Sequence, residues 1–145
     1  DLLCTYAVEQ VVLAIVVTTG IASIFLTKDY TPDYNSGLAH AIFYALTAYP
    51  VIEERHLHGE VVAFGILIAL LVDGQKEEFE KIYELNKSIG LPARLSDIEI
   101  TPAQWEECLA RIPAMSDVAH YPYKVTRPML EQAMKILEER AVSHR

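Results

Sequence analysis

Apolar residues recur at helical spacing through most of this chain, and no strand-like alternation of apolar and polar residues lasts more than a few positions. This pattern limits the chain to helical architectures. Its 145 residues are enough for one domain with a core of ordinary size. The sequence therefore predicts an all-α fold, a bundle of about six helices in a single helical domain over residues 1–145.

Capping residues and breakers mark where the predicted helices begin and end. Asn35 or Ser36 is expected to cap a helix that stops before Pro50, and Thr101 begins a capping signature. The segment 51–57 is expected to be a polar connection. The predicted helices span residues 11–26, 36–49, 59–72, 75–89, 101–112 and a last segment that follows Thr126.

The run from Val11 to Leu26 is the most apolar segment, and residues 1–50 carry only five charged side chains. A membrane-spanning helix is one interpretation. The run has 16 residues, fewer than the roughly 20 that a bilayer needs, and it lacks flanking Lys/Arg asymmetry. We therefore expect a buried helix inside a soluble domain, with no membrane partner.

Charge and cysteine content exclude several classes of protein. The net charge of −8 argues against a nucleic-acid partner, because such proteins usually present a basic patch. Cys4 and Cys108 stand 104 residues apart, so neither a disulfide scaffold nor a cysteine zinc site is expected. Both are read as ordinary buried or half-buried residues, which indicates a reducing, cytoplasmic location.

Histidines are the candidate functional residues. His40 interrupts an otherwise apolar helix, and His58 opens the next apolar helix. A neutral imidazole is a good zinc or iron ligand, although a spacing of 18 residues is no local zinc motif. His56 is read as a polar residue at a cleft edge, His120 as a surface loop residue and His144 as incidental.

Two segments resemble a known family. Asn35-Ser-Gly-Leu-Ala-His40-Ala-Ile and His58-Gly-Glu-Val-Val-Ala-Phe-Gly65 are similar to the C-terminal helical domain of glycerol dehydrogenase-like enzymes, in the iron-containing (group III) alcohol dehydrogenase superfamily. The resemblance implies the fold of the dehydroquinate synthase-like C-terminal domain. It also implies that His40 and His58 bind Zn²⁺ or Fe²⁺, and that Glu60 either supports a metal ligand or is structural.

The resemblance further implies a Lewis-acid metal, a small-molecule alcohol substrate and hydride transfer to NAD or NADP. In such enzymes an N-terminal domain binds the nucleotide and an upstream Asp completes the metal site. This chain has no Gly-rich phosphate loop and no Asp in that context. We therefore expect a metal-binding domain whose nucleotide-binding partner domain is absent, inactive alone and homo-oligomeric in the full-length enzyme.

Two alternatives remain open. One is a free-standing helical interaction or scaffold module with structural histidines; the start at Asp1 and the apolar first half favour the enzyme fragment instead. The other is a small metal-dependent hydrolase, for which only Glu53, Glu54 and Glu60 could supply a base. If the metal hypothesis is right, the two imidazoles should converge within about 3–5 Å. With two ligands the site should be weak unless an acid from another chain completes it.

Overall fold

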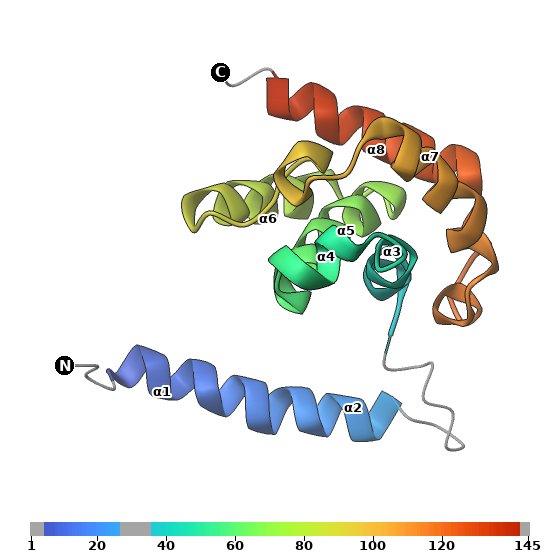
Figure 1. Cartoon of the computed structure of the whole chain (residues 1–145). Helices are drawn as coiled ribbons and strands as arrows, with labels where there is room; N and C mark the ends of the chain where they lie inside the picture. Colours follow the sequence, from blue (N-terminus) through green and yellow to red (C-terminus); the bar gives the residue numbers. More distant parts are fainter. Residues whose placement is uncertain (1–4, 27–35, 143–145) are drawn as a thin grey trace. The chain divides into compact units, whose positions relative to one another are not determined.

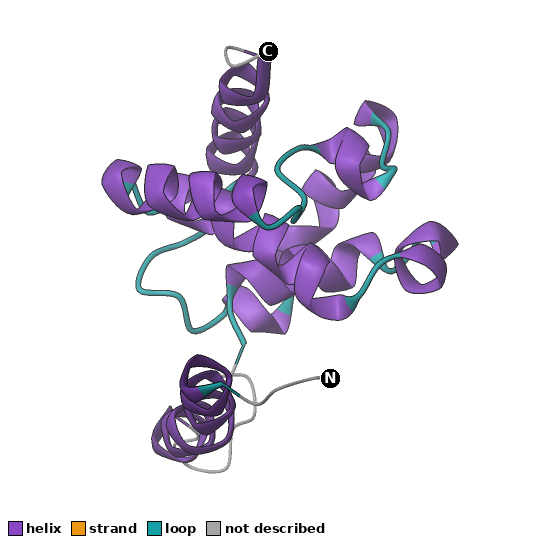
Figure 2. Cartoon of the chain, turned by 90° about the vertical axis from the view of Figure 1, so that its left-hand side faces the viewer, coloured by secondary structure: helices purple, strands orange, loops and turns teal. Residues whose placement is uncertain are grey.

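The computed structural model describes residues 5–26 and 36–142, and it divides the chain into two compact units, Asp1–Asn35 and Ser36–Arg145. Every regular element in the described residues is a helix (Figure 2). The prediction of an all-α fold is confirmed. The metal-site candidates all lie in the second unit.

The first unit is one continuous helical segment made of α1 (Tyr6–Leu13), a π-helical stretch (Ala14–Thr19) and α2 (Gly20–Leu26). Thr5 caps its start, where the hydroxyl accepts the N–H of Val8. The segment is longer than the sequence suggested, and none of the apolar window Tyr6–Phe25 is buried. The prediction of a buried core helix is therefore wrong for this structure.

This helix spans 20 residues, and its most apolar window of 18 residues has a mean hydropathy of 2.0, so its length and composition would allow it to cross a membrane. Core helices of soluble proteins and N-terminal signal sequences meet the same criteria. The helix is therefore weak evidence for any one of the three.

The second unit is built around α5, which packs against α3, α6 and α8 (Figure 1). Helix α7 packs against both α3 and α8. The core that results is apolar and almost free of polar side chains, with Asn86 and Asp117 the buried exceptions among the described residues. The helices are α3 (Leu38–Leu46), α4 (Pro50–Arg55), α5 (His58–Val72), α6 (Lys76–Ser88), α7 (Pro102–Arg111) and α8 (Arg127–Val142).

Local signals explain most of these boundaries. Thr101 caps α7 with a reciprocal capping box to Gln104, and Pro102 occupies the first turn. Gly74 and Gly90 follow α5 and α6 with φ of 73° and 77°, a left-handed conformation that glycine adopts without steric cost. These three helix ends agree with the sequence prediction.

Three boundary predictions are wrong. Helix α3 ends at Leu46 rather than near Pro50, and its N-cap is Gly37, not Asn35 or Ser36. The expected polar connection contains helix α4, because Pro50 fits the first turn of a helix and Ile52 is buried in the core. The link between the two histidine-bearing helices is therefore itself helical.

Candidate metal site

The close approach of α3 and α5 sets the position of the candidate site. Gly65 faces the backbone of Ala39, and a Cβ at Gly65 would lie 2.7 Å from the carbonyl oxygen of Ala39. Only a residue without a side chain permits this approach. Because α4 turns the chain back between the two helices, the start of α5 comes to lie beside α3.

His40 and His58 meet at this junction. Their ring centroids lie 5.6 Å apart, with an angle of 44° between the ring planes. Two imidazoles that share one tetrahedral ion, with metal–nitrogen bonds of about 2.0–2.1 Å, need ring centroids about 5 Å apart. Measured between ring centroids, the observed separation is slightly larger than this value and lies just outside the predicted range of about 3–5 Å. The structure thus brings together the two histidines that the sequence selected, while metal binding itself stays a prediction.

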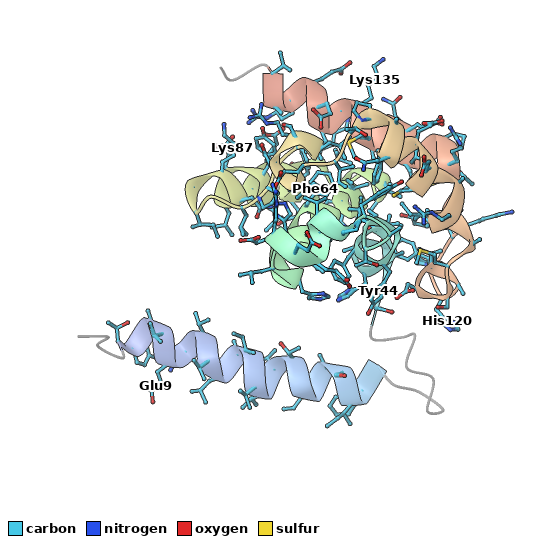
Figure 3. The ribbon with its side chains drawn as sticks, viewed as in Figure 1. Glu9, Tyr44, Phe64, Lys87, His120 and Lys135 are labelled. Carbon is cyan, nitrogen blue, oxygen red and sulfur yellow. The ribbon has the colours of Figure 1, made fainter. Side chains whose placement is uncertain are left out.

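Aromatic neighbours hold the two rings. Phe43 and His58 make an edge-to-face contact. Their ring centroids lie 4.3 Å apart, and the angle between the ring planes is 76°. Tyr44 lies 6.4 Å from the His40 ring and is 46% exposed, at the surface of the second unit (Figure 3). Phe43 thus restrains the His58 ring from the side of α3.

The two histidines differ in environment. His40 is half-buried, whereas His58 is exposed. Burial lowers the pKa of His40, the neighbouring His58 lowers it further, and the carboxylate of Asp117 acts in the opposite direction. The neutral imidazole, which is the form that binds metals, is therefore favoured at His40. A site with one exposed ligand is open to a further ligand from solvent or from another polypeptide.

No third ligand completes the pair among residues 5–26 and 36–142, where no cluster of three or more His, Cys, Asp or Glu side chains could hold a metal ion. Asp117, 9% exposed, is the nearby buried carboxylate that sequence reasoning missed. It lies in a short 3₁₀ turn, Ser116–Val118, that follows the 3₁₀ turn at the end of α7, and nothing in its local sequence marks it as buried. Asp117 accepts a hydrogen bond from Ser116 at 3.5 Å.

The remaining candidates have other surroundings. The side chain of His56 is 11% exposed, with Nδ1 3.8 Å from Glu60 and Nε2 3.7 Å from Glu99; its predicted place at a cleft edge stays a prediction. Glu60 accepts the N–H of Leu57 at 3.0 Å and so helps to begin α5. His120 lies in an exposed turn, and His144 and Cys4 fall outside the described residues.

Comparisons with known proteins agree with this architecture. The chain is 33% identical over 124 residues to a glycerol dehydrogenase from Pseudomonas putida, an alignment that covers 79% of the chain and 32% of that protein. It is 30% identical over 104 residues to hydroxycarboxylate dehydrogenase A of Escherichia coli, covering 69% of the chain and 28% of that protein. No protein-family model matches the chain.

A solved structure is also similar. The crystal structure of a probable glycerol dehydrogenase from Sinorhizobium meliloti superposes with a TM-score of 0.63 at 28% sequence identity. The match covers 74% of this chain and 31% of that chain. The matched region thus spans about a third of the length of each of these three proteins.

Proposed function

Because the chain is glycerol dehydrogenase-like in both sequence and fold, we propose that it is the metal-binding part of an NAD(P)-dependent dehydrogenase that oxidises a polyol or other hydroxy compound. The observation that carries the proposal is the convergence of His40 and His58 from two helices, with ring centroids 5.6 Å apart. The relatives named for glycerol and for hydroxycarboxylates support this substrate class.

The two histidines would supply two ligands to a divalent zinc or iron ion. Such an ion, when bound, acts as a Lewis acid that lowers the pKa of a substrate hydroxyl. His40 contributes a neutral imidazole, because burial lowers its pKa, and His58 contributes a ring held by Phe43. Two ligands fit only part of a metal site, so the proposal includes an acidic ligand from outside the described residues.

The nucleotide site is also proposed to lie elsewhere. The described residues contain no strand, so they cannot form the βαβ unit that binds dinucleotides. Hydride transfer needs cofactor and substrate in one cleft. We therefore expect no NAD-linked oxidation of glycerol by the 145-residue chain alone; turnover by this chain, with contaminating enzymes excluded, would contradict the proposal.

The proposal keeps the wider expectations drawn from the sequence. These are a cytoplasmic location, a homo-oligomeric assembly with the nucleotide-binding domain, and no membrane or nucleic-acid partner. The net charge of −8 supports the absence of a nucleic-acid partner. A buried, unpaired Cys108 is consistent with a reducing compartment.

Zinc titration by isothermal calorimetry tests the metal assignment. The metal-free parent chain and its His40→Ala, His58→Ala and double variants are each titrated with Zn²⁺. His120→Ala is the matched control. We expect weak uptake by the parent and by His120→Ala, and loss of uptake in the other three with unchanged circular dichroism. Equal zinc affinity of the double variant would refute the site and favour the alternative of a helical module with structural histidines.

A further inference from the structure

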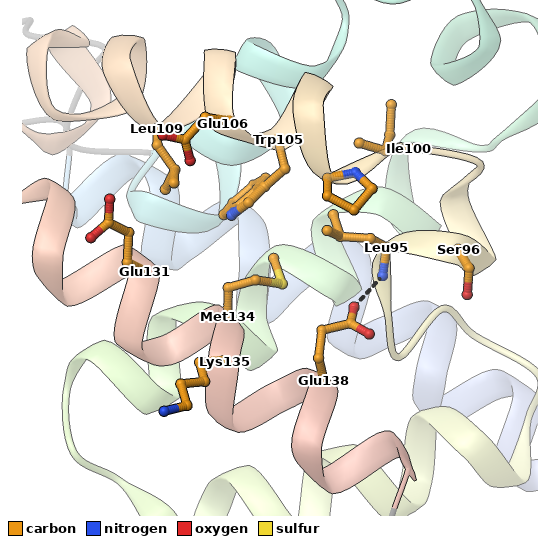
Figure 4. A pocket seen from close by; sticks show the side chains of 11 residues that line it. Leu95, Ser96, Ile100, Trp105, Glu106, Leu109, Glu131, Met134, Lys135 and Glu138 are labelled. Carbon is orange, nitrogen blue, oxygen red and sulfur yellow. Dashed lines mark hydrogen bonds between the residues drawn. The ribbon is translucent and has the colours of Figure 1, made fainter.

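A pocket of different composition lies beside α7, away from the two histidines. It has a volume of about 460 Å³ and opens between the 3₁₀ turn Leu95–Ile98, α7 and α8 (Figure 4). This volume is within the range of small-molecule sites. Neither His40 nor His58 lines it, so it is separate from the proposed metal site. Its floor is apolar and consists of Leu95, Ile100, Pro102, Trp105, Leu109 and Met134.

Trp105 has an unused hydrogen-bond donor. Its side chain is 4% exposed, and its indole Nε1 has no acceptor among the described residues. Figure 4 shows the nitrogen edge of the ring turned toward the helix that carries Met134. A buried donor without a partner destabilises the fold, so native proteins rarely leave one unsatisfied. The flexible side chain of Met134 can move aside to let an acceptor reach this N–H.

The rim of the pocket is acidic. Three carboxylates, Glu106, Glu131 and Glu138, line it against one ammonium group, that of Lys135. Lys135 in turn lies 3.9 Å from the carboxylate of Glu139, which offsets its charge. With Arg127 counted, which pairs with Glu106 and Glu131, carboxylates still outnumber cations around the apolar floor.

Existing contacts fix these carboxylates in place. Arg127 joins α7 to α8: it pairs with Glu106 and donates from Nε to Oε1 of Glu131 at 2.6 Å. Oε1 of Glu138 accepts the N–H of Leu95 at 2.9 Å, drawn as the dashed line in Figure 4. A carboxylate offers about four acceptor positions, so each can accept further hydrogen bonds from a ligand.

We propose that this pocket binds an amphipathic organic cation: a primary ammonium group on an apolar body that carries an oxygen acceptor. The ammonium meets the glutamate rim, the apolar body covers the floor, and the oxygen accepts the N–H of Trp105. Each part of the ligand is inferred from a separate observation: the ammonium from the charge of the rim, the apolar body from the composition of the floor, and the oxygen from the unpaired indole N–H. The assignment does not depend on the metal site.

Trp105 also supplies the readout, because it is the single tryptophan of the chain. The 145-residue chain is titrated with 3-phenoxypropylamine while indole emission is recorded. Three probes of similar shape each change one feature: 4-phenylbutylamine replaces the oxygen by a methylene, 3-phenoxypropanol removes the charge, and 3-phenoxypropionate reverses it. We expect saturable binding that is tightest for 3-phenoxypropylamine, weaker for 4-phenylbutylamine and weakest for 3-phenoxypropanol. We expect no response to 3-phenoxypropionate.

Charge-removing variants locate the binding. In the double variant Glu131→Gln, Glu138→Gln, both amide oxygens can still accept the bonds from Arg127 and Leu95, so we expect the fold to be preserved. We expect the dissociation constant for the amine to rise roughly tenfold or more. Glu77→Gln, an exposed α6 residue outside the pocket, is the control and should not change it.

Three results would overturn the proposal. They are equal binding of the amine and the carboxylate, unchanged affinity in the double variant, and an emission change that follows self-association instead of probe concentration. Sedimentation velocity at two protein concentrations detects the last of these and would assign the pocket to a second copy of the chain.

Discussion

Replacing Gly65 by Ala is expected to destabilise the protein and to disturb the histidine pair. The added Cβ would lie 2.7 Å from the oxygen, 3.0 Å from the Cα and 3.2 Å from the carbonyl carbon of Ala39. All three are backbone atoms of α3, so no side-chain rotation relieves the contact. Helix α3 must move away from α5.

Two opposing effects set the magnitude. Overpacking of a filled interior costs about 1–3 kcal/mol, and a clash with backbone belongs in the upper part of that range. Alanine in a helix is favoured over glycine by about 1 kcal/mol. The net loss in the free energy of unfolding is therefore expected to be about 1–2 kcal/mol.

Gly59→Ala provides the matched control, since Gly59 lies in the same helix and a Cβ there meets nothing within 4 Å. We expect it to be neutral or slightly stabilising. Urea unfolding, followed by Trp105 emission and by circular dichroism, measures both variants. Zinc uptake should fall in Gly65→Ala and stay unchanged in Gly59→Ala. A Gly65→Ala variant as stable as Gly59→Ala would refute the close-approach reasoning.

Three further predictions concern pH, reactivity and capping. Because the pKa of His40 is lowered on folding, the unfolded chain takes up the proton first. The free energy of unfolding should therefore fall as pH drops below about 6.5, and His40→Gln should weaken this dependence in urea titrations at several pH values. Burial raises the pKa of the fully buried Cys108 thiol, while Arg111 lowers it in part. Peptide mapping after iodoacetamide treatment should show Cys108 unmodified in the native chain and modified in urea; prompt native labelling would contradict its burial. Thr101→Ala removes the hydroxyl that accepts the N–H of Gln104 at 3.3 Å and should cost about 1 kcal/mol in urea unfolding, whereas Thr101→Ser should cost little.

The site could be predicted only in part from the sequence. The two histidines stand out because each is a polar residue in an apolar helix, and the structure brings their rings together. Asp117 and the environment of His56 could not be predicted. Their burial depends on residues that pack from elsewhere in the chain. Glu99, for example, lies beside His56 although it is 43 residues further along the sequence. Glu99 is also the described non-glycine residue with positive φ.

The sequence by itself determined the helical class and the helix ends at Gly74, Gly90 and Thr101, because caps and left-handed turns involve residues only a few positions apart. Only the tertiary structure decided that Pro50 begins a helix, that the apolar N-terminal helix is exposed, and that residues 95–138 enclose a pocket. Burial is a property of surfaces that meet across long sequence separations. Hydrophobicity along the chain records which residues favour burial, but not which surface covers them.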